Sequence, residues 1–343
     1  MKAAVYGGPG KLDLMDVPRP QVAAHEILVR VRVALICGTD VKTFLRGHHS
    51  FKPGDILGHE FTGVVEEVGR DVTVCKPGDR VTVAPYVNCG YCFYCRQGLA
   101  DLCVDKSYVS NGAFAEYVKL TEFHARKGLY VLPPATSLVR GAFTEPLACV
   151  LNGVGDTGIE PADVVLIMGA GPMGLLHLLV ARLRGATRLV VSEPQAHRRA
   201  MASSFGAHAI HPEEVYEVIM AYTEGRGADR VIVANAVPEL VAAAMQLVRP
   251  GGRVTLFGGF APGTTVSIDP NRIHYGRVVL VGESGFAPIH FHRAADLLAT
   301  GHDALPVERL VTHRFTLDDI GQAFEVAASQ QAVKVEIDVE GGE

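Results

Sequence analysis

Two different patterns of apolar residues divide the chain. Near both ends, apolar residues alternate with polar ones, most clearly in Val29-Arg30-Val31-Arg32-Val33 and Val333-Lys334-Val335-Glu336-Ile337, which predicts strands with one buried face. In the middle, residues 164–168 form a fully apolar run that is typical of a strand buried in a parallel sheet. Similar strand patterns at 230–234, 253–257 and 278–281 are separated by helical stretches. We therefore predict an α/β chain in which a doubly wound parallel sheet lies between β-rich ends.

The apolar run at 164–168 ends in a glycine-rich turn, Gly169-Ala170-Gly171-Pro172-Met173-Gly174, which opens a helix from Leu175 to Arg184. This spacing is typical of a dinucleotide site: the first glycine makes the turn, the second lets the backbone approach a pyrophosphate, and the third allows close packing. Glu193, after the next strand, can accept from both ribose hydroxyls and repel a 2′-phosphate. We therefore expect NAD, although a solvated loop acid is the alternative interpretation of Glu193, and Arg198 and Arg199 leave room for NADP.

Length and composition fit an ordinary soluble globular protein. A chain of 343 residues exceeds what one hydrophobic core usually supports, so we expect two domains. The net charge of −5 gives no electrostatic reason to expect nucleic acid or an anionic membrane as a partner. The chain begins directly with a strand-like pattern, so we expect no signal peptide. The apolar stretch 164–181 contains glycines and a proline, which fit a strand–turn–helix unit better than a membrane span.

The cysteines indicate a metal site rather than a disulfide framework. There are seven, an odd number, and four of them fall at metal-binding spacing: Cys89, Cys92, Cys95 and Cys103. Such a compact loop can close on one tetrahedral ion, and four thiolate ligands leave no open position, so we predict a structural zinc. A redox dithiol, unpaired thiols and an iron–sulfur cluster are the alternatives. The absence of a disulfide pattern indicates a reducing cytoplasm.

A second candidate metal site is centred on Gly58-His59-Glu60, with Cys37 upstream after an apolar run. Cysteine, histidine and carboxylate oxygen form a ligand set that suits zinc. Adjacent side chains of an extended strand point to opposite faces, so the chain must turn at Gly58 for both to serve one site. Taken alone the pair is weak evidence, because a core histidine beside a solvated glutamate is the commoner arrangement.

Together these residues resemble a zinc-dependent medium-chain alcohol dehydrogenase over essentially the whole chain. The matching segments are Cys37-Gly38-Thr39-Asp40, Gly58-His59-Glu60 with Gly63 and Gly69, the four-cysteine loop, Glu145-Pro146-Leu147 and the dinucleotide turn. The resemblance implies a GroES-like β-rich catalytic domain made from residues 1–150 and 289–343, with a Rossmann NAD-binding domain inserted at 151–288. Glu145 resembles the sorbitol (polyol) and threonine dehydrogenase branches, because the animal and yeast alcohol dehydrogenases carry a cysteine there.

The resemblance also implies roles for single residues. Cys37, His59 and Glu60 would hold a catalytic zinc, with Glu145 as fourth ligand or as an acid beside the metal. Thr39 would relay the alcohol proton, whereas without the flanking motif it would be interpreted as a turn-stabilising hydroxyl. With the four-cysteine loop, two zinc ions per subunit are expected. We also expect a cytoplasmic homo-oligomer, a tetramer or a dimer.

Two positions depart from the family pattern. Lys42 stands where relatives often carry a histidine at the outer end of the proton relay, and lysine is ordinarily a poor base at neutral pH. The proton would then leave either through a desolvated Lys42 or through water. Ala234-Asn235-Ala236 stands where relatives commonly place an acidic residue and a Ser/Thr-Gly pair, which puts details of the nicotinamide-ribose contacts in doubt.

The expected function is a zinc-dependent oxidoreductase that transfers hydride from a secondary alcohol of the polyol type to NAD. A polyol offers two adjacent hydroxyls to a carboxylate-rich metal site, so ethanol is expected to be a poor substrate. One alternative is L-threonine 3-dehydrogenase, which uses the same metal set. Another is a non-catalytic NAD-binding structural protein, which would need none of the five candidate catalytic residues: Cys37, Thr39, His59, Glu60 and Glu145.

Overall fold

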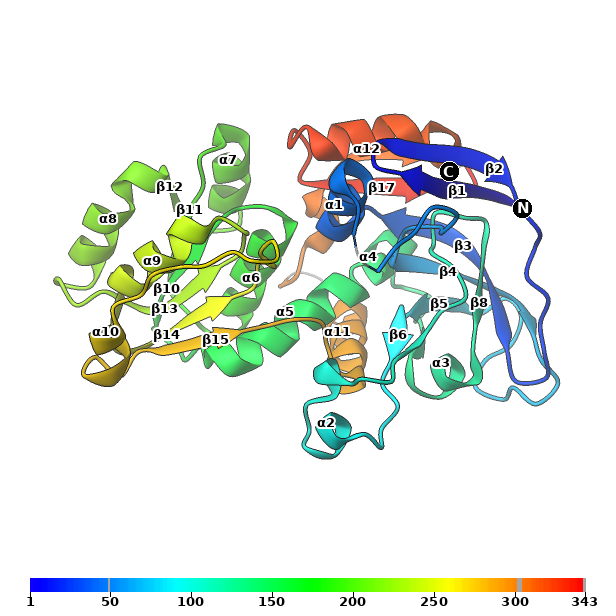
Figure 1. Ribbon diagram of the computed structural model, residues 1–343, viewed down its shortest axis with the longest axis horizontal. Helices are drawn as coiled ribbons and strands as arrows, with labels where there is room; N and C mark the ends of the chain where they lie inside the picture. The colour runs from blue at the N-terminus through cyan, green and yellow to red at the C-terminus, as the bar shows by residue number, and fades with distance from the viewer. Residues whose placement is uncertain (49, 301–303, 342–343) are drawn as a thin grey trace. The chain divides into compact units, whose positions relative to one another are not determined.

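The structure is a computed structural model that describes residues 1–48, 50–300 and 304–341. The chain forms two compact units (Figure 1): residues 1–148 and 286–343 make unit 1, and residues 149–285 make unit 2. The boundary at residue 148 falls within helix α5 (Thr144–Thr157). Unit 1 is therefore assembled from both ends of the chain, and unit 2 from its middle.

A seven-stranded, largely antiparallel sheet forms the body of unit 1. Its strands lie in the order β16-β17-β3-β4-β5-β9, and β8 also pairs with β3. Their bounds are β3 (Ile27–Leu35), β4 (Glu60–Val68), β5 (Arg80–Val83), β8 (Tyr117–Leu120), β9 (Leu129–Val131), β16 (Val311–Thr316) and β17 (Lys334–Asp338). Two two-stranded antiparallel sheets accompany this sheet: β1 (Lys2–Gly8) with β2 (Lys11–Asp16), and β6 (Tyr86–Val87) with β7 (Ser107–Tyr108). At the end of β3, Leu35 pairs with Glu60 on one side and Glu336 on the other, so β4 and β17 both begin near this point.

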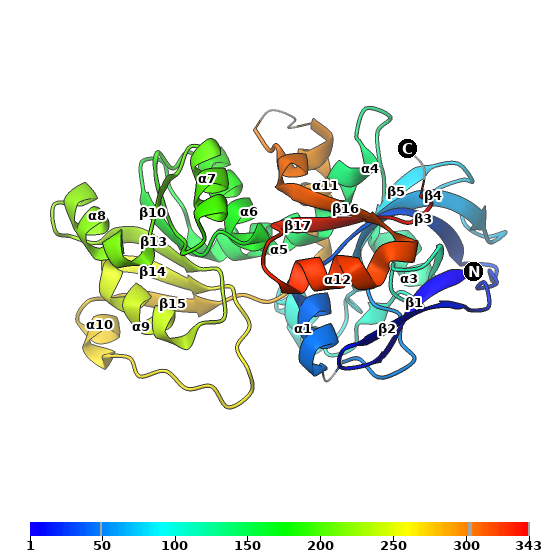
Figure 2. The same ribbon diagram turned by 90° about the horizontal axis from the view of Figure 1, so that it is seen from above.

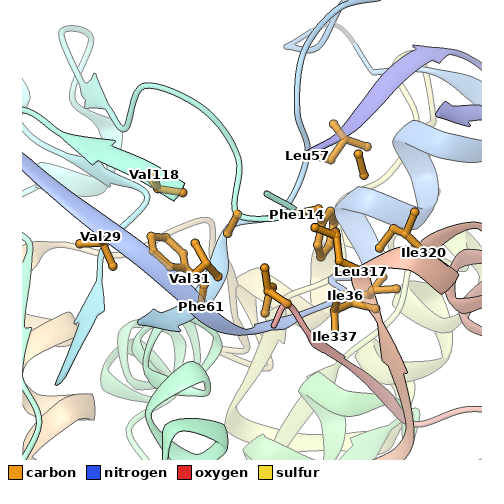
Figure 3. Packing of buried hydrophobic residues seen from close by; sticks show 14 of the residues in the cluster. Val29, Val31, Ile36, Leu57, Phe61, Phe114, Val118, Leu317, Ile320 and Ile337 are labelled. Atoms are coloured by element: carbon orange, nitrogen blue, oxygen red, sulfur yellow. The ribbon is translucent and has the colours of Figure 1, made fainter. Parts of the chain in front are cut away.

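The core of unit 1 draws on segments that are far apart in the sequence (Figure 3). Strands β3 and β4, the loops around Leu57 and Phe114, and the C-terminal segment all contribute. The labelled residues are at most 4% exposed: Val29, Val31, Ile36, Leu57, Phe61, Phe114, Val118, Leu317, Ile320 and Ile337. Burial of each large apolar side chain contributes about 1.5–3 kcal/mol. The C-terminal segment is therefore an integral part of the unit that contains the N-terminal strands.

Helix α1 directly follows β3 and starts beside the pairing just described. The helices of unit 1 are α1 (Gly38–Arg46), α2 (Phe93–Arg96), α3 (Glu122–Lys127), α4 (Leu138–Ala142), α11 (Pro288–Thr300) and α12 (Ile320–Ala328). Short 3-10 turns are η1 (Ala100–Leu102), η3 (Val307–Leu310) and η4 (Leu317–Asp319). The rings of Phe44 in α1 and Phe324 in α12 lie 5.2 Å apart, and Figure 2 shows the two helices side by side. This packing holds α1 against the C-terminal segment.

Unit 2 contains a six-stranded parallel sheet in the order β12-β11-β10-β13-β14-β15. The strands are β10 (Val164–Met168), β11 (Arg188–Ser192), β12 (His208–Ile210), β13 (Ala228–Val233), β14 (Val248–Leu256) and β15 (Val279–Gly282). The connecting elements are α6 (Pro172–Leu183), α7 (Ala196–Ser204), η2 (Pro212–Glu214), α8 (Val215–Tyr222), α9 (Pro238–Leu247) and α10 (Pro270–His274). The strand order reverses direction at β10, as in doubly wound folds. The predicted doubly wound parallel sheet is confirmed.

The apolar stretch 164–181 folds as β10, a glycine turn and most of α6. Every residue of β10 is buried, because the strand pairs on both edges and lies in the middle of the sheet. Its continuous apolar character therefore reflects a buried parallel strand, as predicted. Among the residues that the structure describes, no helix is long and apolar enough to cross a membrane.

Candidate metal centres and dinucleotide turn

Three candidate zinc ligands come together where β3, α1 and β4 meet. Cys37 caps the N-terminus of α1, His59 precedes β4, and Glu60 begins it. One ligand atom from each residue lies within 4.8 Å of the others. The turn that brings His59 and Glu60 to one site depends on Gly58, whose φ is +97° and whose position leaves no room for a side chain: an added Cβ would lie 2.9 Å from the backbone nitrogen of Phe114.

A buried carboxylate, Asp40, organises this cluster. It accepts hydrogen bonds from the backbone N–H groups of Cys37 at 2.9 Å and Gly58 at 3.3 Å, and its Oδ1 lies 3.3 Å from Nδ1 of His59. Burial lowers the pKa of His59, but the Asp40 carboxylate and then Cys37 outweigh it, so that the pKa lies well above 6.5. A carboxylate on Nδ1 fixes the imidazole ring and favours Nε2 as the metal ligand.

Glu60 also forms a buried ion pair with Lys334, the first residue of β17. Nζ of Lys334 lies 2.5 Å from Oε2 of Glu60, and the two side chains are 2% and 0% exposed. Burial lowers the pKa of Lys334, but Glu60, Cys37 and Glu145 together raise it above 10.5. The cluster of candidate ligands therefore has a cation of the protein beside it.

The other candidate catalytic residues lie outside the three-residue cluster. Glu145, in the first turn of α5, is 9% exposed and acts electrostatically on Lys334. Thr39 is half-buried in the first turn of α1, where its carbonyl accepts a hydrogen bond from the Thr43 hydroxyl at 2.8 Å. Lys42 is half-buried in the same helix. The structure thus brings together Cys37, His59 and Glu60 and does not group Glu145 with them as a ligand.

The four predicted cysteines of the second site lie close together around α2 and η1. Their sulfur atoms are 3.4 Å apart for Cys92 and Cys95, 3.6 Å for Cys89 and Cys103, and 3.9 Å for two further pairs. Four sulfurs at about 2.3 Å from a tetrahedral zinc stand roughly 3.8 Å from one another. These separations fit one zinc ion. They are too long for disulfide bonds, and they are shorter than those between the cysteine sulfurs that hold an iron–sulfur cluster of several irons.

Hydrogen-bond donors around the sulfurs favour thiolates, whereas burial raises the pKa of Cys103 to about 11. The backbone N–H of Cys92 donates to the sulfur of Cys89 at 3.4 Å, and the side-chain amide of Asn88 donates to that of Cys95 at 3.3 Å. A backbone hydrogen bond from Cys95 is the main reason why the pKa of Cys92 is lowered to about 6. The ammonium of Lys127 donates to the carbonyls of Asn88 and Cys89 at 3.2 Å, which ties the loop to α3.

In unit 2, the glycine-rich turn has the geometry that its spacing predicts. Gly169 has a φ of +111°, and a Cβ at Gly174 would lie 1.9 Å from the carbonyl oxygen of Gly169, so neither position accepts a side chain. Gly171 caps α6, with Pro172 and Met173 as its first residues. The free N–H groups at this helix N-terminus form an anion-binding end.

Glu193 lies beside this turn and is only 4% exposed. Its two carboxylate oxygens accept hydrogen bonds from the backbone N–H groups of Ala170 at 2.8 Å and Gln195 at 2.9 Å. The acid is therefore buried and hydrogen-bonded within the turn and is not a solvated loop residue. Burial lowers the pKa of Arg198, and Glu193 opposes that shift. A guanidinium nitrogen of Arg198 lies 4.0 Å from the position of a Cβ at Gly171. An acid and a cation therefore share the edge of the candidate ribose site.

Sequence reasoning missed two side chains of the metal cluster. Asp40 could have been found, because a carboxylate three residues after a helix cap commonly bonds back to the cap backbone. Lys334 had no signal beyond its place in an alternating strand. Asn235, noted as a departure from the family pattern, donates its side-chain amide to the carbonyl of Met168 at 3.2 Å and so links the ends of β13 and β10.

Comparison with known families covers both units. Residues 23–129 match the family Alcohol dehydrogenase GroES-like domain, and residues 172–300 match the family Zinc-binding dehydrogenase. The first match contains both candidate metal clusters, and the second begins within the glycine turn. The two matches together span more than half of the chain.

Individual relatives match over nearly the full length. The chain is 31% identical over 345 residues to a sorbitol dehydrogenase from Halalkalibacterium halodurans, with 98% of each chain covered. It is 33% identical over 337 residues to an L-threonine 3-dehydrogenase from Pyrococcus abyssi, with 94% of each covered. A solved zinc-binding dehydrogenase from Sinorhizobium meliloti 1021, bound to NADP, is 35% identical with a TM-score of 0.89, and 98% of this chain and 99% of that one are covered.

Proposed function

This chain belongs to the zinc-dependent medium-chain dehydrogenases, and on that premise we propose that it oxidises a secondary hydroxyl of a polyol, with NAD as hydride acceptor. The resemblance to this family that the motifs indicated is confirmed, and so is the enzyme class. A non-catalytic NAD-binding role is set aside, because the full-length relatives are dehydrogenases. The substrate and the roles of single residues are our proposal.

The observation that carries the proposal is the convergence of Cys37, His59 and Glu60. Thiolate, imidazole and carboxylate are donors that zinc accepts, and three protein ligands leave the open position that a catalytic zinc needs. Oε1 of Glu60 is buried and has no hydrogen-bond partner among the described residues, so a bound cation would satisfy it. When bound there, zinc would supply a Lewis acid at the substrate hydroxyl.

We assign the remaining roles to residues around this cluster. The Thr39 hydroxyl, two residues after Cys37, passes the alcohol proton toward solvent through Lys42 or water. Asp40 holds the His59 ring through its 3.3 Å contact. Glu145 is the fourth ligand, or an acid beside the metal that receives a second substrate hydroxyl. Its electrostatic effect on Lys334, which pairs with Glu60, supports a place near the cluster.

A polyol fits this site better than a simple alcohol does. Glu60 and Glu145 make the donor set harder than a two-cysteine set, and hard centres favour oxygen ligands. A vicinal diol offers two hydroxyls to such a site, whereas ethanol offers one. The sorbitol dehydrogenase relative supports this assignment. The threonine 3-dehydrogenase relative favours a second candidate, oxidation of L-threonine at its secondary hydroxyl.

We propose NAD as the preferred cofactor. The phosphates would lie at the glycine turn and the N-terminus of α6, made by Gly169, Gly171, Pro172, Met173 and Gly174. The Glu193 carboxylate would accept the ribose hydroxyls and repel a 2′-phosphate, with Arg198 opposing that repulsion. Because the Sinorhizobium meliloti structure contains NADP, the preference must be measured with both cofactors.

We further propose that the four-cysteine loop binds a second, structural zinc and that the chain works as a cytoplasmic homo-oligomer, a dimer or a tetramer. Four of the seven cysteines fall at metal-binding spacing rather than in a disulfide pattern, which supports a reducing compartment. Strand β15 is an edge of its sheet, and its Val279 is 38% exposed, so a second copy could cover it. Size-exclusion chromatography with light scattering tests the assembly.

Steady-state kinetics on zinc-loaded enzyme test the proposal. The substrates are sorbitol, xylitol, 2,3-butanediol, L-threonine and ethanol, each with NAD and with NADP. We expect the highest kcat/KM with a polyol or diol and NAD, and a value at least about tenfold lower with ethanol. A preference for L-threonine would support the second candidate instead. Cys37→Ser should abolish turnover, whereas Cys75→Ser, outside both clusters, should not; no reduction of NAD or NADP with any alcohol would overturn the proposal.

A further inference from the structure

Tyr86 lies at the base of the four-cysteine loop and has no part in the proposed function. It belongs to β6, which pairs with β7 through Tyr86 with Tyr108 and Val87 with Ser107. The chain leaves this short sheet through the loop that contains α2 and the four cysteines, and it returns to the sheet at β7 (Figure 1). The ammonium of Lys106, just before β7, lies 4.6 Å from the centre of the Tyr86 ring. Both ends of the loop therefore meet at Tyr86.

Tyr86 also holds the segment in which the chain passes from unit 2 to unit 1. The boundary lies between Gly285 and Phe286. The Tyr86 hydroxyl accepts a hydrogen bond from the backbone N–H of Phe286 at 2.9 Å, and the two rings stack with centroids 4.8 Å apart. Phe286 is 2% exposed and also stacks on Phe291 of α11. The first residue after the boundary is therefore fixed to the base of the loop.

The peptide group between Gly285 and Phe286 is hydrogen-bonded at both ends. Its N–H donates to Tyr86, and its carbonyl oxygen accepts from the side-chain amide of Asn152 at 3.2 Å. Asn152 lies in the part of α5 that belongs to unit 2, where it also donates to the carboxylate of Glu283 at 3.2 Å. A peptide group is planar and turns as one body. It cannot turn here without lengthening one of these two hydrogen bonds.

We propose that Tyr86 couples the four-cysteine loop to the peptide that joins the two units, so that zinc in this loop holds that peptide in one orientation. The inference rests on the proposed function, because it assumes a zinc ion at the four cysteines. A sheet with two residues in each strand has little stability of its own, and β6 and β7 must also close the loop of residues 88–106. Four thiolates that share one zinc ion close this loop, since Cys89 lies near its β6 end and Cys103 near its β7 end. Without the zinc, the pairing of β6 with β7 loosens and the Tyr86 hydroxyl releases the N–H of Phe286.

A zinc ion that only stabilised unit 1 would behave differently. Its loss would speed the hydrogen exchange of many backbone amides by similar factors, with or without the Tyr86 hydroxyl. The coupling predicts faster exchange at one amide, that of Phe286. The next amide, that of Ala287, is an internal reference, because its N–H donates to Nδ1 of His290 at 3.3 Å and not to Tyr86.

Hydrogen–deuterium exchange of the full-length, zinc-loaded protein, resolved to single amides by mass spectrometry, tests the coupling. Tyr86→Phe keeps the ring and removes the hydroxyl, and Tyr108→Phe is the matched control, because Tyr108 is the residue paired with Tyr86 and is 62% exposed. Cys92→Ser removes the zinc of the four-cysteine loop. Cys37→Ser, which loses the other zinc, is the control for metal loss. The zinc content of each variant is measured beside its exchange.

Tyr86→Phe and Cys92→Ser should each speed exchange of the Phe286 amide about three- to tenfold relative to that of Ala287, as expected for the loss of one hydrogen bond. Tyr108→Phe and Cys37→Ser should leave this ratio unchanged. A chain with both Tyr86→Phe and Cys92→Ser should show no increase beyond Tyr86→Phe alone, because both changes remove the same hydrogen bond.

An unchanged ratio in Tyr86→Phe or in Cys92→Ser would overturn the inference. Effects that multiply in the double variant, or an equal effect in either control, would overturn it as well. If Cys92→Ser does not fold, the zinc of the loop is withdrawn with a chelator from folded Cys37→Ser protein, and the same change in the exchange ratio of Phe286 to Ala287 is expected.

Zinc content separates this inference from the proposed function. If Cys92→Ser keeps as much zinc as the unmodified chain, the structural zinc site fails and the coupling fails with it, while the polyol activity is judged from the kinetics alone. If the zinc is lost and the Phe286 amide does not respond, only the coupling through Tyr86 is wrong.

Discussion

Replacing His177 with leucine should remove an acid sensitivity that is built into unit 2. His177 lies in α6, is fully buried, and packs edge-on against the ring of Phe257 with centroids 4.5 Å apart. Neither ring nitrogen has a hydrogen-bond partner among the described residues. Burial therefore lowers the pKa of His177 from 6.5 to about 3.

The sign and size of the effect follow from proton linkage. Between pH values of about 6.5 and 3 the unfolded chain binds a proton at this position and the folded chain does not, so stability falls as the pH falls through this range and is flat above it. With these two pKa values the loss is about 2 kcal/mol at pH 5 and only about 0.2 kcal/mol at pH 7. A buried imidazole without partners also costs about 1–3 kcal/mol at any pH. His177→Leu should therefore be more stable throughout, and increasingly so in acid.

Urea unfolding of the zinc-loaded full-length protein at about pH 7.5 and 5 measures the difference. Other groups titrate in both proteins, so the difference between the chain with His177 and His177→Leu isolates this residue. His197→Leu is the control, because His197 lies exposed on α7 of the same unit; it should shift neither the stability nor its pH dependence. Equal losses of stability in acid for the chain with His177 and for His177→Leu would refute the reasoning, as would a leucine variant less stable at both pH values.

Three further substitutions have defined outcomes. Asp40→Asn removes the charge that holds His59, so zinc affinity at the catalytic cluster should fall about 10–100-fold in a chelator competition, and an unchanged affinity would show that Asp40 only caps α1. Cys92→Ser should lower the zinc content by one ion and reduce the melting temperature, with Cys75→Ser as the control; full zinc content in purified Cys92→Ser would contradict the structural site. Glu193→Ala should weaken NADH binding by about tenfold or more in a fluorescence titration and reduce the ratio of NADH affinity to NADPH affinity. An equal loss of affinity for both cofactors would mean that Glu193 only maintains the shape of the turn.

The features that the sequence predicted well are those determined by residues close together in the chain. The Gly169 to Gly174 turn is one, because its backbone angles and close approaches are set by six consecutive residues. The four cysteines are another, since a loop of this length brings its sulfurs together whatever surrounds it. The buried strand at 164–168 was predictable because a strand covered on both faces has no polar position.

The features that it did not predict depend on pairing between distant segments. Lys334 meets Glu60 only because β17 and β4 both pair with the end of β3. An alternating strand pattern shows that one face is buried, but not which chemistry lies against the other face. Glu145 illustrates the same limit: the family motif identifies it, yet its position relative to Cys37, His59 and Glu60 depends on how α5 begins after α4.

The assembly of unit 1 from both ends of the chain has a consequence for its synthesis. The end of β3 pairs with β17, whose residues are translated about 300 positions later; at about 5–20 residues per second, that edge waits roughly 15–60 s for its neighbour. During this interval Cys37, His59 and Glu60 have left the ribosome before Lys334 exists. A nascent chain paused near its end would thus carry an open sheet edge and a bare ligand carboxylate, both of them targets for chaperones. The β3 edge can therefore be completed only after β17 has been synthesised.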